Sequence, residues 1–242
     1  MNAARIPQIY ARAAGLLYLV VIVLGGFAYG YVPGKLVSDN AAVTANNILS
    51  HELLWRIGIV AALIVVACAL AQLLFEFLLL RPVQRNVTLL AVFFNLLSLA
   101  IETLGNLGYF AAIRLLEGQG SLSGLPTHQL QAWASLAIDL HDTTLNISFM
   151  FFGITCLLYG YLIFRSRFLP RFLGVLMTLA GFCYISNSLM DFLNLQTPGF
   201  PWLLVPAGLS ELTLCLWLLI AGVNAQKWHA WTDHGMRLSQ PT

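Results

Sequence analysis

Acidic and amide side chains stand inside long apolar stretches of this chain, and they are the residues best suited to chemistry. Glu102 and Glu211 each interrupt such a stretch, and Asp191 lies near the end of another. A charged side chain at the centre of a bilayer costs at least about 2.5–3.5 kcal/mol, so such residues usually face a helix bundle or a water-filled cavity. We therefore predict that these acids face one another inside a membrane protein.

Polar residues recur at helical spacing around these acids. Asn95, Glu102, Asn106 and Tyr109 follow one another by steps of 7, 4 and 3, which keeps them on one helix face. Similar stripes are predicted for Asp139, Asp142 and Asn146, for Tyr184, Asn187 and Asp191, and for Gly208, Glu211, Cys215 and Gly222. We expect the stripes to form one polar pocket open to the outer side, with a ligand-binding set of Glu102, Asn106, Asp139, His141, Asp142, Asn187, Asp191 and Glu211.

Three acidic or histidine side chains need separate comment. His141 lies about 100° around the helix from Asp142, so its membership in the pocket is open. Glu76 falls outside the set, because it is expected near the cytoplasmic end of its helix, with Gln72 one turn away. For Glu211 we predict a position facing the bundle interior, within reach of Asn106 and Asn187.

Three functions fit such a pocket. The first is binding or passage of a small polar ligand or ion, because carboxylate and amide oxygens are ligands for hard cations. The second is a structural or regulatory role with a hydrogen-bonded polar core. The third is a membrane-embedded, metal-assisted hydrolase. Only His141 and loop-edge His51 lie in or beside an expected span, no HExxH-type motif is present, and no metal site or cofactor is assigned.

Composition identifies the class of protein. Of the 242 residues, 59% are hydrophobic and 9% are charged, against roughly 25% charged in soluble domains. A net charge of +2 with scattered basic residues argues against a nucleic-acid partner. The four cysteines have no CxxC spacing and are expected to be buried as small apolar side chains. The lipid bilayer is therefore the predicted partner.

The apolar stretches are long enough for helices that cross a bilayer, which needs roughly 20 residues each. We predict an all-α, polytopic membrane bundle forming a single domain over residues 1–242. Its six transmembrane helices are expected at about 13–31, 54–80, 87–113, 140–164, 170–193 and 202–224. The segments 32–52 and 115–131 are interpreted as outer surface loops. The first stretch also has the basic start of a signal peptide, but its apolar core is longer and no cleavage motif follows.

Basic residues predict the orientation of these helices. With a cytoplasmic N-terminus, nine of the 12 Lys and Arg residues lie on the cytoplasmic side: Arg5, Arg12, Arg81, Arg85, Arg165, Arg167, Arg171, Lys227 and Arg237. Loops on that side are normally enriched in Lys and Arg. Six helices return the C-terminus to the same side, so both termini are expected in the cytoplasm.

Glycines inside the apolar stretches are expected where two helices pack closely, because the missing side chain lets backbones approach. The glycines predicted to do so are Gly15, Gly25, Gly26, Gly105, Gly108, Gly208 and Gly222.

Several segments resemble a bacterial multi-pass membrane family catalogued as domain-of-unknown-function 4386. They begin with Arg12 to Leu19 and Leu80 to Val83, continue through Asp139 to His141 and Tyr161 to Gly174, and end with Glu211 to Leu219. The resemblance covers roughly residues 10–222. It implies an all-helical fold in the bacterial inner membrane, and no reaction, substrate or cofactor. The family's motifs include positions that match His141, Arg171 and Glu211.

Overall fold

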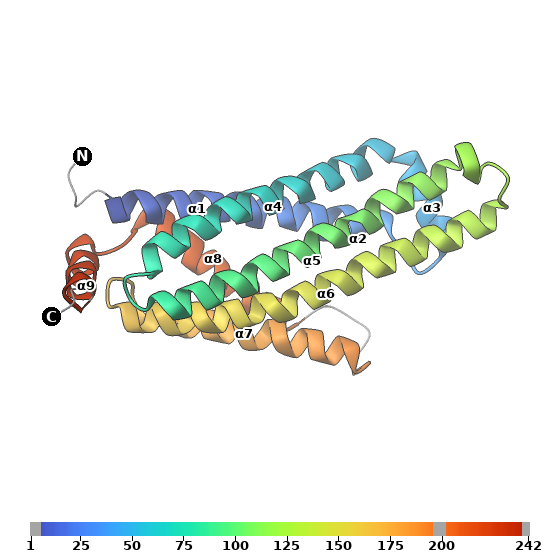
Figure 1. The fold of residues 1–242 in the computed structure, drawn as a ribbon. Coiled ribbons are helices and arrows are strands. Elements are labelled where there is room, and N and C mark those ends of the chain that lie inside the picture. Colours follow the sequence, from blue (N-terminus) through green and yellow to red (C-terminus); the bar gives the residue numbers. More distant parts are fainter. Residues whose placement is uncertain (1–5, 196–201, 239–242) are drawn as a thin grey trace. The chain divides into compact units, whose positions relative to one another are not determined.

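The computed structural model describes residues 6–195 and 202–238, and within them every regular element is a helix, as predicted. The long helices are α1 (Ile6–Gly25), α4 (Glu52–Leu80), α5 (Arg85–Glu117), α6 (Thr127–Ser166), α7 (Arg171–Phe192), α8 (Leu204–Ile220) and α9 (Ala225–Leu238) (Figure 1). The short elements are the π-helical segment η2 (Gly26–Tyr31), α2 (Val32–Leu36), α3 (Ala41–Ser50) and the 3-10 turn η3 (Gly120–Leu122).

The helices are long and apolar enough for a multi-pass membrane protein. Five helical segments in the described part of the chain meet this criterion, and α8 with α9 makes a sixth if the pair, bent by 95°, is one span. The six predicted spans agree with this number. Helix α6 differs most from its prediction, because it begins at Thr127 and has 40 residues. At 1.5 Å per residue it is about 60 Å long, twice the thickness of a bilayer's hydrocarbon core.

The prediction of loops at 32–52 and 115–131 is wrong for much of both segments. The first contains α2 and α3, and the second contains the end of α5 and the start of α6. Helix α3 begins after Asn40, whose side-chain oxygen accepts from the backbone amides of Ala42 at 2.9 Å and Val43 at 3.2 Å. This is the usual capping role of Asn, so polar residues here start a helix.

The chain divides into two compact units, each assembled from separate segments. Unit 1 comprises Met1–Leu19, Cys68–Ser98 and Ser148–Thr242, and unit 2 comprises Val20–Ala67 and Leu99–Ile147. Helices α1, α4, α5 and α6 each contribute residues to both units.

In unit 1, glycines allow α6 and α7 to pack backbone against backbone. A Cβ atom added at Gly174 would lie 2.7 Å from the carbonyl oxygen of Gly160, and one added at Gly181 would lie 2.7 Å from that of Gly153. These four glycines are not among the predicted packing positions, although the two of each helix stand seven residues apart, a helical spacing visible in the sequence. At Gly15 of α1, an added Cβ would lie 2.7 Å from the Leu219 nitrogen of α8, as predicted for that glycine.

In unit 2, Gly105 and Gly108 are confirmed at the contact of α5 with α6. A Cβ atom at Gly108 would overlap the carbonyl oxygen of Ala137 and lie 3.0 Å from the Cβ of His141, while one at Gly105 would overlap the Thr144 hydroxyl. Helix α5 therefore approaches α6 along the turn that carries His141.

The remaining predicted glycines have different environments. Added Cβ atoms at Gly25, Gly26 and Gly208 would meet nothing within 4 Å among the described residues, so their prediction as packing positions is wrong. Gly222 has φ +67° and a Cβ there would overlap the Gln8 side chain. It ends α8 in the left-handed conformation that glycine adopts without steric cost.

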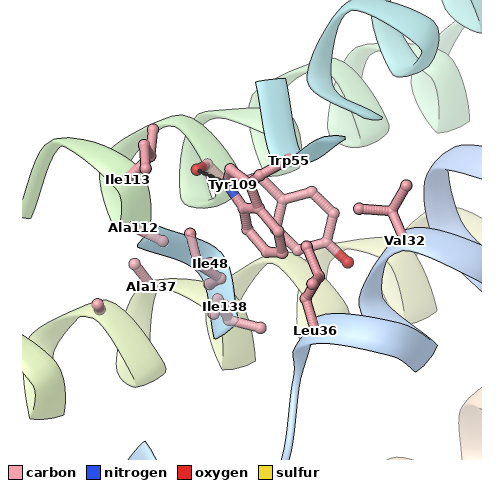
Figure 2. Close-up of a cluster of buried hydrophobic side chains, with 10 residues drawn as sticks. Val32, Leu36, Ile48, Trp55, Tyr109, Ala112, Ile113, Ala137 and Ile138 are labelled. Atoms are coloured by element: carbon pink, nitrogen blue, oxygen red, sulfur yellow. Dashed lines mark hydrogen bonds between the residues drawn. The ribbon is translucent and has the colours of Figure 1, made fainter. Parts of the chain in front are cut away.

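Unit 2 has an apolar core made by parts of five helices. Its buried members are Val32, Leu36, Ile48, Trp55, Tyr109, Ala112, Ile113, Ala134, Ala137 and Ile138 (Figure 2). The Trp55 indole nitrogen donates to the Tyr109 carbonyl oxygen at 3.0 Å, shown as a dashed line in Figure 2. This hydrogen bond joins α4 to the backbone of α5 at Tyr109. The Tyr109 ring lies against one of the polar residues described next.

Candidate functional site

In unit 2, the π-helical segment η2 brings a tyrosine to one of the predicted acids. The Tyr29 hydroxyl donates to Glu102 Oε1 at 2.8 Å, and it accepts from the Asn106 side-chain nitrogen at 3.3 Å. A π-helical turn shifts the following side chains around the helix axis and occurs frequently at functional sites. Glu102 and Asn106 thus lie together, as predicted, and Tyr29 joins them.

His141 lies beside this group and is 1% exposed. Its ring stacks on Tyr109 with centroids 3.6 Å apart and lies 5.7 Å from the Tyr29 ring. Neither ring nitrogen of His141 has a hydrogen bond of standard geometry among the described residues, and the same holds for the Asn106 side-chain oxygen. Most buried polar atoms in proteins are hydrogen-bonded, so these three atoms of unit 2 are unusual.

The two aspartates on α6 have other surroundings. Asp139 is exposed and lines an open hollow of about 310 Å³ together with Ser38, Asp39 and Thr44. Asp142 is also exposed and interacts with Tyr109. His141 is therefore buried, whereas its acidic neighbours Asp139 and Asp142 on the same helix are exposed.

In unit 1, Glu211 of α8 is 8% exposed and faces other helices, as predicted. The Tyr184 hydroxyl of α7 donates to Glu211 Oε1 at 2.5 Å, and the Tyr18 side chain of α1 is a second hydrogen-bond partner. Tyrosines from two helices thus surround this carboxyl group.

A second acid of unit 1, Glu76 of α4, is 6% exposed. The Gln72 side-chain nitrogen donates to Glu76 Oε1 at 2.8 Å. Glu76 and Glu211 are close enough to interact electrostatically. Glu76 lies outside the predicted set, although its position in an apolar stretch carries the same signal as that of Glu211.

The two acids belong to a group of buried polar side chains, to which each of the six long helices of unit 1 before α9 contributes one. They are Tyr18, Glu76, Asn95, Tyr159, Tyr184 and Glu211. The Tyr159 hydroxyl is directed at Glu76 and Asn95, but like the Gln72 side-chain oxygen it has no hydrogen bond of standard geometry in the described part of the chain. We call these six side chains and Gln72 the unit 1 polar cluster.

The cluster contains two acids and, among residues 6–195 and 202–232, whose side chains are described, no basic side chain forms an ion pair with either. All three ion pairs seen there belong to unit 2: Arg56 with Glu52 at 2.7 Å, Arg56 with Glu117, and Arg114 with Glu117 at 3.8 Å. The acids of unit 1 are therefore surrounded by neutral hydrogen-bonding groups.

The last two predicted residues also lie in unit 1. Asn187 is buried on α7, one turn after Tyr184, and Asp191 is half-buried near the end of that helix. Of the eight predicted residues, five thus belong to unit 2 and three to unit 1. A single pocket formed by all eight stays a prediction.

A family model described as "Domain of unknown function (DUF4386)" matches residues 13–222 of the chain. The chain belongs to this family. It is also similar to a protein of Archaeoglobus fulgidus described as "Uncharacterized protein", with 28% identity over 150 residues, which are 60% of this chain and 72% of that protein. No solved structure matches the chain.

The three DUF4386 motif positions noted in the sequence have unlike surroundings. His141 is enclosed by aromatic rings and Glu211 by tyrosines, whereas Arg171 is exposed at the start of α7. The Arg171 guanidinium lies 5.5 Å from the centroid of the Phe164 ring, within the range of a cation–π contact.

The described part of this DUF4386 protein has no group of three or more His, Cys, Asp and Glu side chains placed to hold a metal ion. Its four cysteines are free, with Cys156, Cys183 and Cys215 buried and Cys68 half-buried. Burial of three of them agrees with their interpretation as small apolar side chains.

Proposed function

We propose that this membrane protein binds a proton or another small cation at the carboxyl groups of Glu76 and Glu211 in the unit 1 polar cluster. The supporting observation is that two interacting acids are buried in one cluster without a basic partner among the described side chains. Burial of an unpaired negative charge is costly, and a bound cation removes that cost.

The neutral groups of the cluster suit such binding. Tyr18 and Tyr184 donate to Glu211, and Gln72 donates to Glu76, so either carboxyl group keeps a donor when its charge changes. The Tyr159 hydroxyl and the Gln72 side-chain oxygen supply further oxygen atoms for an incoming cation. Carboxyl groups of this kind form proton relays in membrane pumps and transporters.

A structural polar core is the second candidate. It is favoured by the same hydrogen bonds, which already give each acid a donor from another residue. In that case both acids would stay protonated at all times and serve only to join helices.

Replacement of each acid by glutamine separates the two functions, because glutamine hydrogen-bonds but does not ionise. The infrared band of protonated carboxyl groups is titrated against pH for the wild type, Glu76→Gln and Glu211→Gln in detergent. If the cluster binds protons, a pH-dependent part of the band disappears in both variants, while it persists in the control Glu102→Gln. A band that is unchanged in both variants, or that never responds to pH while the protein is folded, contradicts the proposal.

We also propose, more broadly, that the eight residues predicted from the sequence bind ligand from the outer side, five of them in unit 2 and three in unit 1. Asn106 tests this for unit 2 and Asn187 for unit 1. Each is replaced by Cys in a variant that lacks the four native cysteines, and intact cells are treated with a membrane-impermeant thiol reagent. We expect labelling of both positions, and protection of either from the reagent would refute outer access in that unit.

We infer that the protein lies in the bacterial plasma membrane with both termini in the cytoplasm. The distribution of nine of the 12 basic residues supports this orientation. Reporter fusions after Arg81 and Arg167 should give cytoplasmic signals, and a fusion after Ser121 should give an external one. An external signal at Arg167 would reverse the assignment.

A further inference from the structure

A basic hollow lies where α6 and α9 of unit 1 meet. It has a volume of about 740 Å³ and is lined by Arg165, Arg167, Lys227, Ala230 and Trp231. Three of these five residues are cationic, and none of the described lining residues is acidic. The hollow is therefore a place of concentrated positive charge.

The walls of this hollow are fixed by hydrogen bonds across unit 1. The backbone nitrogen of Asn224, just before α9, donates to the Phe168 carbonyl oxygen at 3.0 Å. The Trp228 indole nitrogen of α9 donates to the Leu79 carbonyl oxygen at the end of α4 at 2.9 Å. Helix α9 is thereby held against the α6–α7 connection, after its 95° bend from α8.

The Arg165 side chain and the Arg167 backbone have defined conformations at this hollow. Arg165 Nη1 donates to the Tyr161 hydroxyl at 2.5 Å, and that hydroxyl donates to the Gln84 side-chain oxygen at 3.1 Å. Arg167 has φ +59°, a left-handed conformation that non-glycine residues adopt rarely and at a steric cost. The chain thus keeps an arginine where glycine would be less strained.

A second hollow of about 410 Å³ shares Arg167 and Lys227 with the first. Its other lining residues are mainly apolar: Phe168, Leu169, Pro170, Trp217, Ala221, Gly222, Val223 and Asn224. A cationic hollow that adjoins one with apolar side chains in its wall fits a molecule with a negative head and an apolar tail. Free phosphate has no group for the apolar part.

We propose that the two hollows bind an anionic phospholipid, with its phosphodiester at Arg165, Arg167 and Lys227 and its first acyl carbons against Leu169 and Trp217. Guanidinium groups bind phosphate oxygens in pairs. A helix bent from a span and carrying Lys227 and Trp231 is suited to the headgroup layer, where basic residues attract anionic lipids and tryptophan is enriched. This proposal is independent of the carboxyl groups of the unit 1 polar cluster.

Native mass spectrometry of the full chain in detergent tests the proposal. Phosphatidylglycerol and phosphatidylcholine with identical acyl chains are added in equal amounts, and bound lipid is counted. The wild type should retain phosphatidylglycerol preferentially. Arg165→Gln/Lys227→Gln should reduce that preference about tenfold or more, since each basic residue contributes roughly 1 kcal/mol to anionic lipid binding. The matched control Arg81→Gln/Arg85→Gln removes two charges from the α4–α5 connection and should retain it.

Equal retention by the two double variants, or equal loss in both, would overturn the proposal. So would displacement of phosphatidylglycerol from the wild type by inorganic phosphate, because the hollows would then bind free phosphate. If the double variant fails to fold, a photoactivatable phosphatidylglycerol on the wild type gives the answer. It should cross-link to peptides containing residues 165–171 or 225–231, and cross-linking confined to residues 81–85 would overturn the proposal.

Discussion

Units 1 and 2 each direct a tyrosine hydroxyl at a glutamate, in one case from Tyr184 to Glu211 and in the other from Tyr29 to Glu102. Their surroundings differ. Glu211 is 8% exposed and interacts with a second buried acid, Glu76, whereas Glu102 is half-buried and its neighbours are an amide and aromatic rings. Unit 1 therefore brings two acidic side chains together in its interior, and the described part of unit 2 does not.

The two units also differ in whether their acids form ion pairs with basic side chains. Unit 2 pairs Glu52 and Glu117 with Arg56 near the ends of their helices. In unit 1 the described side chains offer Glu76 and Glu211 only neutral donors. An acid paired with arginine has little need of an external cation, while two unpaired buried acids gain from one. The comparison thus favours unit 1 over unit 2 as the site of the proposed cation binding.

The largest expected effect is on helix packing, which both units need to hold their polar residues. Gly160→Leu should destabilise the protein by ~1–3 kcal/mol or more, because its Cβ would lie 2.8 Å from backbone atoms of Gly174 and Thr178 that cannot rotate away. Gly108→Leu should act similarly in unit 2. Thermal unfolding in detergent measures both, with Gly208→Leu as the control in open space. A control that unfolds as early as the other two would show that any added leucine is harmful.

Removal of the acids should affect unit 1 more than unit 2. Glu211→Leu should cost ~1–3 kcal/mol, because it leaves the buried Tyr184 hydroxyl without its acceptor. Glu102→Leu should cost less, because Glu102 is half-buried and Tyr29 retains Asn106 as a partner. Unfolding midpoints give the order, and Glu211→Gln should stay near the wild type. The reverse order of the two leucine variants would place the more critical acid in unit 2.

Removal of the tyrosine hydroxyls should give smaller differences in the same direction. Tyr184→Phe should lower stability by about 1 kcal/mol and Tyr29→Phe by less, since a half-buried carboxyl group can regain polar contacts. Tyr31, exposed in the same π-helical segment as Tyr29, provides the control Tyr31→Phe. Chemical unfolding in detergent compares the three. An effect of Tyr31→Phe equal to that of Tyr29→Phe would attribute the loss to the segment and not to Glu102.

The smallest effect is expected at the ion pairs of unit 2. Arg56→Gln should shift the unfolding midpoint slightly at low salt and not at all at high salt, because partly exposed ion pairs are weak and screened. Unfolding at two salt concentrations measures this, with Lys35→Gln as a control, because Lys35 is an exposed cation of unit 2 outside these ion pairs. A shift that persists at high salt would mean that Arg56 acts through packing.

The outcome for individual residues shows which predictions local information supports. The interior position of Glu211 follows from its charge within an apolar helix and is confirmed. The absence of a side chain predicts helix contacts correctly at Gly105 and Gly108 but wrongly at Gly25, Gly26 and Gly208, because it does not specify which helix faces a glycine. The polar composition of residues 32–52 favours a loop, and the prediction is wrong because Asn40 caps a helix there, which is a local signal visible in the sequence.

The properties of a single helix do not predict which residues of other helices it contacts. Tyr29 meets Glu102 across 73 residues of sequence, and it does so from a π-helical segment that changes which side chains face inward. Glu76 and Glu211 come from α4 and α8, and helical periodicity within either one does not specify the other as its neighbour.

The sequence by itself determined that this is an all-helical membrane protein with Glu211 turned toward its interior. The physical reason is that long apolar runs need helices to satisfy their backbones in a bilayer, and buried charge must avoid the acyl chains. Only the tertiary structure decided which tyrosines meet those acids, that Glu76 joins Glu211, and that His141 stacks on Tyr109. These contacts depend on the rotation and pairing of whole helices, which are set by close packing at glycines and by hydrogen bonds between distant segments.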